Sequence, residues 1–526
     1  MATTVLASAA SASLVIRVPT TEGALAAALA HVAETRKPGE LVDLLLEAGE
    51  HHINETLTLG PKHSDLTLKR ADPDAAAVVT GGLRISASEW RAYKHPIIVA
   101  PVKLPGNVVP KQMFTGGGTI RATRARHPNL YASDGATVHE RPYLYWQSPI
   151  CDTHANRSKA CANASQHGLH WAPHDDATFD TVRGETDLEA VVYHGWTVSR
   201  HYVSSISADG NRTLEFSNPA ERPIGFWSGL DSEGGQRFYL ENSLRLLDAP
   251  GEFYVDGHRS LLYYVPLPGE AHRNGSAYLP LLEELLLIDG AVNVNVDGIT
   301  LRHADWSCGG SARTLPCDGQ SVEWQDTAAV HVRHSANVSF LAVEVSAVGP
   351  AAVWIDEDVD DARIERCRFA NLGTGAVRIG HPAHNAVFHP ARTWPMRPPA
   401  HVKLADSSLV DGSNVFAGGT AVLVQFATGV VIEHNEVSNF SYTAISLGWT
   451  WNYRTQASSG HTVRYNHVHH LGYPRRETGD AMACFYTLGQ LNGTHVHDNV
   501  CSDVRAYMSG GYQRLTQCMH SPMCMH

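Results

Sequence analysis

Residues 429–440 (GVVIEHNEVSNF), 461–471 (HTVRYNHVHHL) and 494–504 (THVHDNVCSDV) repeat one pattern, and this pattern decides the fold. In each segment apolar and polar residues alternate up to an asparagine, and the alternation resumes after it. Such alternation is typical of a strand with one buried face, and an asparagine suits the tight bend between two strands. The segments therefore predict stacked coils of short strands.

More degenerate copies of the unit begin near residue 291 and lead into these segments. Four bend asparagines recur about 20 to 35 residues apart, as coils of about 20–25 residues with variable loops require. We expect each to adopt a left-handed backbone conformation and to bond to the next in a ladder. These are Asn414, Asn435, Asn466 and Asn499.

Apolar residues beside the bends are expected to fill the interior of the coils. The candidates are Val431, Val437, Val463 and Val468. A leucine-rich repeat would show regular leucine spacing and a propeller would show blades of about 40–50 residues, and neither pattern is present. The sequence thus predicts an all-β protein built as a right-handed parallel β-helix.

The rest of the chain divides around this solenoid. Residues 21–34 (TEGALAAALAHVAE) space apolar residues as a helix does, which predicts an N-terminal cap helix. Strands separated by Gly/Pro turns predict an inserted β-rich subdomain. The predicted boundaries are 1–20 for a possible targeting segment, 21–90 for the cap and first coils, 91–290 for the insertion, 291–512 for the β-helix, and 513–526 for an aberrant or disordered tail.

Composition limits the classes of partner. The 526 residues carry a formal charge of −12 without a Lys/Arg-rich cluster, which argues against a nucleic-acid ligand. No stretch approaches the ~20 apolar residues of a membrane helix. No zinc-protease, serine-hydrolase, P-loop or dinucleotide motif occurs. We expect a monomer that binds an oligo- or polysaccharide.

Cysteines and glycosylation sequons favour an extracellular or secretory location. Cys151/Cys161 and Cys308/Cys317 form two close pairs in polar surroundings, which suits loop-closing disulfides, and the lack of CxxC spacing makes zinc the weaker interpretation. Eight N-x-S/T sequons provide candidate glycosylation sites. They lie at Asn54, Asn156, Asn163, Asn211, Asn274, Asn337, Asn439 and Asn492.

The densest group of aromatic, basic and acidic residues lies between 446 and 489. Aromatic faces can pack on sugar rings while nearby polar groups bind the hydroxyls, although an aromatic residue can equally close a coil. The candidate sugar-binding residues are Trp449, Trp451, Tyr486, His469, His470 and Arg476. For the histidines and Arg476 the alternatives are structural and solvated roles.

Two carboxylates in the same segment are candidate catalytic groups. Asp480 or Glu477 could serve as general acid or nucleophile in glycosidic cleavage, the alternative being a plain surface carboxylate. No cofactor is expected. Calcium is an alternative because residues 356–361 supply several acidic side chains, which could also form a solvated turn.

Several segments, taken in order, resemble the right-handed β-helix glycoside hydrolases of the group with xylanase and α-L-fucosidase activities, close to the pectate-lyase-like superfamily. They include 80–90 (TGGLRISASEW), 113–129 (MFTGGGTIRATRARHPN), 241–256 (ENSLRLLDAPGEFYVD), 445–451 (ISLGWTW) and 485–499 (FYTLGQLNGTHVHDN), within a resemblance that covers about residues 40–512.

The resemblance implies a cleft along the solenoid and a pair of catalytic aspartates. The first matches Asp480, which stands one residue further from Tyr486 than the family spacing. The second is expected in a following coil, where this sequence continues as SGGYQRLTQCMHSPMCMH (509–526) without a coil pattern, so we expect the second carboxylate to be missing. A uronate-cleaving polysaccharide lyase and a non-catalytic glycan-binding β-helix are the competing hypotheses.

Overall fold

A computed structural model gives the structure of the chain. It describes residues 13–106, 108–130, 143–153, 155–194, 197–208, 210–225, 237–270, 276–308, 314–317, 319–381, 397–449, 457–472, 483–508 and 511–514.

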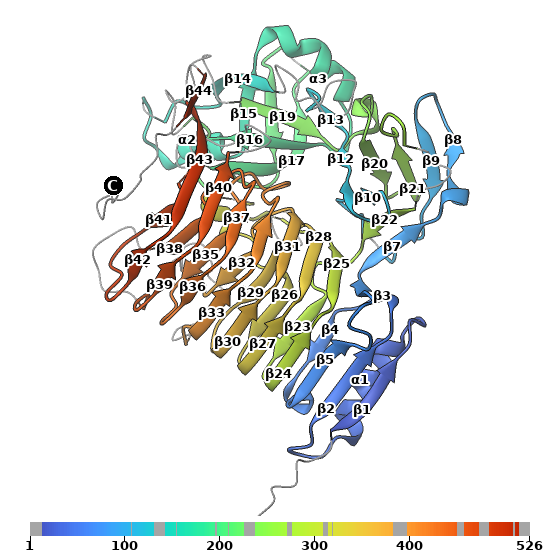
Figure 1. Ribbon diagram of the computed structural model, residues 1–526. Helices are drawn as coiled ribbons and strands as arrows, with labels where there is room; N and C mark the ends of the chain where they lie inside the picture. Colours follow the sequence, from blue (N-terminus) through green and yellow to red (C-terminus); the bar gives the residue numbers. More distant parts are fainter. Residues whose placement is uncertain are drawn as a thin grey trace, which may run out of the picture.

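Three long sheets wind around one apolar core and confirm the predicted parallel β-helix (Figure 1). Each coil contributes one strand to sheet C, one to sheet A and one to sheet B, in that order along the chain. All neighbours within the three sheets are parallel except β43 and β44, which form an antiparallel pair.

The strands follow in spatial order. Sheet A contains β1 (Leu14–Val18), β2 (Val42–Leu46), β5 (Leu66–Arg70), β24 (Val292–Asp297), β27 (Ala336–Leu341), β30 (Asp360–Glu365), β33 (Ala400–Ala405), β36 (Val431–Glu433), β39 (Thr462–Arg464) and β42 (His495–His497). Sheet B contains β3 (Gly49–His52), β6 (Ala77–Thr80), β25 (Thr300–Ala304), β28 (Glu344–Val348), β31 (Arg368–Leu372), β34 (Ser408–Val410), β37 (Glu436–Ser438), β40 (His467–Leu471), β43 (Val500–Met508) and β44 (Gly511–Arg514). Sheet C contains β4 (Leu57–Leu59), β23 (Leu286–Asp289), β26 (Ala328–Arg333), β29 (Ala351–Ile355), β32 (Val377–Ile379), β35 (Val422–Gln425), β38 (Ile445–Gly448) and β41 (Phe485–Thr487).

An asparagine ladder joins successive turns between sheets A and B. The side-chain oxygen of Asn466 accepts bonds from the backbone nitrogen of Asn435 at 3.1 Å and from its amide at 3.0 Å. Asn499 accepts the equivalent pair from Asn466 at 3.0 and 2.9 Å. The left-handed conformation belongs to the residue before each asparagine, such as His434 with φ 57°, so the prediction that asparagine itself adopts it is wrong.

Asn414 is not part of the ladder. Its amide donates to the carbonyl oxygen of Asp411 at 2.9 Å, in a loop beyond β34. The ladder position of that coil is Ser407, whose backbone nitrogen donates to the Asn435 side-chain oxygen at 3.0 Å. The prediction for Asn414 is therefore wrong, because serine replaces asparagine in its coil.

The predicted core valines are confirmed with one exception. Val437, Val463 and Val468 are completely buried. Val431 is only half-buried, and the completely buried side chain of β36 is Ile432. Because strand side chains alternate, the core position of this strand lies one residue later than predicted.

Helix α1 (Ala24–Thr35) covers the first coil. It buries Leu25, Leu29 and Val32 against the solenoid core. Strand β1 precedes it and pairs in parallel with β2, so residues 14–18 belong to sheet A.

The chain leaves the solenoid after β6 and returns at β23 (Figure 1). The excursion begins with β7 and ends with β22, and its strands form three further sheets around two separate apolar clusters. These elements are β7 (Gly82–Ile85), β8 (Arg91–Ala92), β9 (Ile98–Pro101), β10 (Phe114–Thr115), β11 (Ile120–Arg121), β12 (Thr123–Arg124), β13 (Arg126–His127), β14 (Leu144–Pro149), α2 (Lys159–Gln166), β15 (Gly168–Trp171), α3 (Asp176–Val182), β16 (Glu189–Tyr193), β17 (Val198–Ile206), β18 (Thr213–Phe216), β19 (Arg237–Glu241), β20 (Glu252–Asp256), β21 (Leu261–Tyr264) and β22 (Ala277–Pro280).

Both predicted disulfides are present, Cys151–Cys161 in the insertion and Cys308–Cys317 in the loop after β25. A third, Cys484–Cys501, joins the start of β41 to β43 and was not predicted. The sequence gives no local signal for it because the two cysteines belong to different sheets of the solenoid. Cys367 is buried and free.

Seven of the predicted sequon asparagines lie on the surface: Asn54, Asn156, Asn163, Asn211, Asn337, Asn439 and Asn492. Asn274 lies outside the described residues. No helix within the described ranges is long and apolar enough to cross a membrane.

Candidate functional site

A row of side chains runs along the outer face of sheet C. In register across five neighbouring strands lie His331, Trp354, Arg378, Leu423 and Ser446, and β41 adds Tyr486. The flanking positions in these strands are apolar and fill the core. Sheet C therefore presents polar and aromatic groups on its outer face, where a solenoid ordinarily needs only solvated residues.

The first part of the row is packed tightly. The rings of His331 and Trp354 stack at 4.6 Å with an interplanar angle of 2°, and the Arg378 guanidinium lies 4.3 Å from the Trp354 ring. His331 contacts Asp356 at 3.1 Å and Glu284 at 2.9 Å. Burial lowers the pKa of this imidazole, but the two carboxylates outweigh burial and raise it overall.

The loop between β25 and β26 folds over the middle of the row. Arg378 donates to the carbonyl oxygen of Gln325 at 2.5 Å and to the side-chain oxygen of Gln425 at 3.4 Å. A short 3-10 turn, Gln320–Val322, places the Gln320 amide 3.3 Å from the Tyr442 hydroxyl. Since Gln320 also bonds to Tyr486, the loop connects the central row to the last described strand of sheet C.

The same loop carries a buried carboxyl group, Glu323, which is only 6% exposed. Burial, with a smaller contribution from the nearby Glu221, raises its pKa to about 8 against the opposing effect of Arg378 and Arg222. Glu221 comes from the insertion, and its own pKa is raised by burial although Arg222 and the Trp324 indole oppose the rise. A carboxyl group that stays protonated near neutral pH can donate a proton.

Tyr486 is the predicted site residue that lies directly on the row. It is half-buried, and burial raises the pKa of its phenol while the hydrogen bond to Gln320 opposes the rise. Trp449 lies just beyond β38 and donates from Nε1 to the Ser446 hydroxyl at 3.2 Å. Trp449 has φ 86°, a strained conformation for a bulky residue, and its side chain is buried.

The predicted histidines lie on another sheet. His469 and His470 belong to β40 of sheet B, where they contact Glu436 and Asp503, each at 3.3 Å. Tyr486 belongs to sheet C, so the structure does not place these histidines on its row. Trp451, Arg476, Glu477 and Asp480 lie outside the described residues, so their roles stay predictions.

The acidic run that suggested calcium is engaged with basic side chains. Asp356 contacts His331, and the other pairs are Asp358–Arg397 at 3.4 Å, Asp360–His401 at 2.7 Å and Asp361–Arg363 at 3.0 Å. Within the described part of the chain, no group of three or more side chains is arranged to hold a metal ion.

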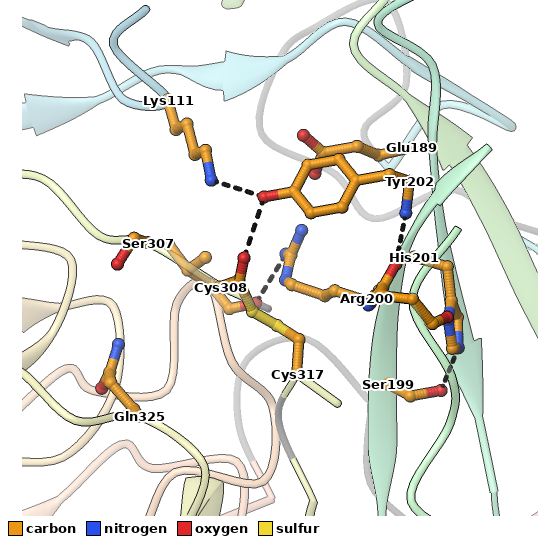
Figure 2. Close-up of a disulfide and its surroundings, with 12 residues drawn as sticks. Lys111, Glu189, Ser199, Arg200, His201, Tyr202, Ser307, Cys308, Cys317 and Gln325 are labelled. Atoms are coloured by element: carbon orange, nitrogen blue, oxygen red, sulfur yellow. Dashed lines mark hydrogen bonds between the residues drawn. A yellow bond between two sulfur atoms is a disulfide. The ribbon is translucent and has the colours of Figure 1, made fainter. Parts of the chain in front are cut away.

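A second polar cluster joins the insertion to the solenoid. Figure 2 shows Tyr202 between Lys111 and the Cys308–Cys317 disulfide: Lys111 donates to the tyrosine hydroxyl at 3.0 Å, and that hydroxyl donates to the Cys308 carbonyl at 3.2 Å. The Lys111 ammonium also lies 4.2 Å from the Trp306 ring. The connection 305–327, which contains both this disulfide and Glu323, is thus tied to the insertion.

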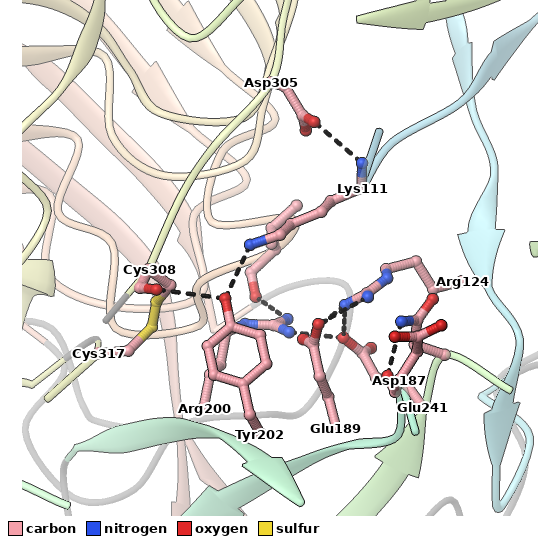
Figure 3. A network of polar contacts seen from close by, with 12 residues as sticks. Lys111, Arg124, Asp187, Glu189, Arg200, Tyr202, Glu241, Asp305, Cys308 and Cys317 are labelled. Atoms are coloured by element: carbon pink, nitrogen blue, oxygen red, sulfur yellow. Dashed lines mark hydrogen bonds and ion pairs between the residues drawn. A yellow bond between two sulfur atoms is a disulfide. The ribbon is translucent and has the colours of Figure 1, made fainter. Parts of the chain in front are cut away.

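Two arginines and two glutamates complete this cluster (Figure 3). Arg124 pairs with Glu189 at 2.8 Å and also with Glu241, while Arg200 pairs with Glu241 at 2.7 Å. Burial would raise the pKa of Glu189, but Arg124, Lys111 and Arg200 lower it to about 2. The carboxylate is therefore held ionised between cations.

Sequence reasoning missed Glu221, Glu323 and the arginine cluster. Glu221 and Glu323 are distant in sequence and meet only because the insertion folds back on the solenoid. The TRAR stretch at 123–126 was the one available signal, since its two arginines stand on either side of an apolar residue as in a strand.

Comparison with known proteins gives a family match for the insertion. Residues 150–267 match the model of the GH141 insertion domain. No curated protein matches the chain. A solved structure titled "Glycoside hydrolase" is 19% identical, with a TM-score of 0.74, and the alignment covers 93% of this chain and 88% of that one. A Yersinia enterocolitica family 28 exopolygalacturonase is 10% identical, with a TM-score of 0.30 over 92% of this chain and 66% of that one.

Proposed function

We propose that the protein is a carbohydrate-active enzyme that cleaves glycosidic bonds of a polysaccharide at the outer face of sheet C. One observation carries the proposal: the insertion, which matches the GH141 insertion domain, brings the half-buried Glu221 close enough to the buried Glu323 of the solenoid loop to raise its pKa. Glycosidic cleavage commonly uses two carboxyl groups, one of which must be protonated at the working pH.

Glu323 is the proposed general acid. Its pKa of about 8 keeps the carboxyl group neutral at pH 7, as protonation of a leaving glycosidic oxygen requires. The proposed second carboxylate is Asp480, which precedes β41 in sequence, with Glu477 as the alternative. Gln320, on the same loop as Glu323, and the half-buried Tyr486 of β41 supply amide and hydroxyl groups that suit sugar hydroxyls.

Three disulfides support an extracellular or secretory location, because such bonds persist in oxidising compartments. The seven surface sequons agree with that environment. We propose secretion, with glycans attached at some of these positions, and a peptide map of the secreted protein before and after glycosidase treatment would test it.

The decisive experiment compares the wild-type chain with Glu323→Gln and Asp480→Asn on xylan, fucosylated polysaccharide and pectin. We expect each variant to lose at least about 100-fold of kcat, the usual scale for removal of an acid or base. Glu436→Gln is the matched control, since this glutamate is exposed on sheet B. Release of reducing ends measures hydrolysis.

Three results would overturn the proposal. Full activity in Glu323→Gln would remove the assigned acid. Products that absorb in the ultraviolet would indicate elimination, hence a lyase. Glycan binding by the wild type without turnover on any substrate would indicate a binding protein.

A further inference from the structure

The junction between insertion and solenoid contains a small, partly open pocket of about 50 Å³, large enough for one charged group of a ligand. Its walls come from three places: the first strands of the insertion, strands β17 and β19, and the solenoid loop after β34. The charged lining residues are Lys111, Arg121, Arg124, Arg126, Arg200 and Glu241.

The lining is strongly basic although the chain as a whole carries a charge of −12. Five of the lining side chains are cationic, and Glu241 is the only acidic one in the set. Glu189 adds a second carboxylate by pairing with Arg124 but does not line the pocket. The pocket is therefore positively charged although the protein as a whole is acidic, and this charge favours the binding of an anion.

Arg200 supplies a specific donor. It lines the pocket and is 5% exposed, and two of its nitrogens bond to Glu241 at 2.7 Å and to the Val415 carbonyl at 2.8 Å. Its third nitrogen, Nε, is buried and has no hydrogen-bond acceptor among the described residues. A buried donor without an acceptor is costly, and a ligand oxygen would remove that cost.

Lys111 adds a second donor at the edge of the same pocket. Its ammonium donates one hydrogen bond to the Tyr202 hydroxyl at 3.0 Å and lies against the Trp306 ring. An ammonium has three N–H donors, so further bonds to a ligand are compatible with this contact. Thr123 and Asn414 add an uncharged hydroxyl and amide to the lining, as sugar hydroxyls require.

We propose that this pocket binds an anionic group on a sugar, either the carboxylate of a uronate or a sulfate ester. Arginine geometry suits both groups, since each presents paired oxygens. The inference rests on the proposed carbohydrate function and narrows its substrate to an acidic glycan. The pocket is distinct from the carboxyl pair: neither Glu221 nor Glu323 is among its lining residues.

Binding to the intact chain tests the inference without turnover. Calorimetric titration would use three trisaccharides: galacturonate, sulfated galactose and neutral galactose. We expect one of the two acidic ligands to bind at least about tenfold more tightly than the neutral one, with an affinity that falls as salt rises. Tighter binding of the galacturonate assigns a uronate site, and tighter binding of the sulfated sugar assigns a sulfate site.

Thr123 offers a matched pair of variants, because it lines the pocket and its backbone pairing in β12 does not depend on the side chain. Thr123→Glu should weaken acidic-ligand binding by at least about tenfold, whereas the equally large Thr123→Gln should change it less than about threefold. Lys111→Met, which keeps the apolar stem, is a second variant and should weaken binding by about threefold or more.

Equal affinity for acidic and neutral trisaccharides, or an acidic-ligand affinity that Thr123→Glu and Lys111→Met leave unchanged, would overturn the inference. Hydrolysis of neutral glycans with no acidic-sugar binding would remove the inference and leave the proposed function intact. Acidic-sugar binding without hydrolysis of any glycan would support the anion-binding pocket and overturn the proposed hydrolase function.

Discussion

The turns between sheets A and B and the loops between sheets B and C are stabilised in different ways. Each A–B turn of the later coils is short, has a left-handed residue such as His434 or Tyr465, and is fixed by the ladder of Asn435, Asn466 and Asn499. The B–C connections range from two residues, 349–350, through the long loop 305–327 to the excursion 81–285 that holds the insertion. The A–B turns that carry the ladder keep two residues, whereas the B–C connections vary in length, and Glu323 and the Cys308–Cys317 disulfide lie on the B–C side.

The largest effect is expected when the ladder is broken in its centre. Asn466→Ala removes the acceptor of two donors of the buried Asn435 and leaves the oxygen of the half-buried Asn499 without its amide partner. Each unsatisfied buried group costs about 1–3 kcal/mol, so we expect a loss of about 3 kcal/mol in the free energy of unfolding. Denaturant titration measures it.

Asn414→Ala is the matched control, because this asparagine lies outside the ladder and its side-chain amide donates to Asp411. A loss of under about 1 kcal/mol is expected there. Equal losses in the two variants would mean that the ladder has no special role.

A smaller effect is expected from the disulfide of the long B–C loop. The variant with both Cys308→Ser and Cys317→Ser should lose about 2.5 kcal/mol, the entropic value for a loop of about ten residues. It should also increase amide exchange over residues 319–325 and reduce activity, since this loop positions Gln320 and Glu323.

The insertion provides the control for this variant. Cys151 and Cys161 close a loop of nearly the same length, with a sequence separation of 10 against 9. Their serine variant should lose similar stability but keep full activity. If both double variants lose activity equally, the B–C loop has no separate positioning role.

The comparison also explains what the sequence could predict. The ladder and the alternating core are local patterns, so Asn435, Asn466, Val437 and Val463 were recognisable without a structure. The placement of Val431 failed by one residue because a short strand gives the alternation few positions from which to be read.

The chemistry of the site depends on contacts between distant segments, which no local pattern records. Glu221 and Glu323 acquire raised pKa values only because the insertion and the long loop exclude water around them. Of the residues predicted from aromatic and polar clustering, Tyr486 lies on the sheet C row, whereas His469 and His470 lie on sheet B. Residues close in sequence thus fall on different sheets, and their roles stay predictions.

The smallest expected effect is a pH dependence of folding stability caused by the buried carboxyl group of Glu323 in the B–C loop. The pKa of Glu323 is raised from 4.5 to about 8, so the folded state retains a proton that the unfolded state loses above pH 4.5. The stability due to this group is therefore full below about pH 4.5 and falls as the pH rises toward 8. Each unit of pKa shift corresponds to about 1.4 kcal/mol, and with partial compensation by water entry we expect a decline on the order of 2 kcal/mol between pH 5 and pH 8.

Glu252 separates this prediction from a general effect of buried acids. Burial raises its pKa to about 8 as well, but it accepts backbone bonds inside the insertion and is not part of the sheet C row. Glu323→Gln and Glu252→Gln should each remove part of the loss of stability between pH 5 and pH 8. Only Glu323→Gln should also change the pH profile of activity. Unfolding midpoints of both variants across pH 5–8 measure this. An unchanged slope in Glu323→Gln would mean that its carboxyl is ionised in the folded protein, which would also remove the basis for its role as proton donor.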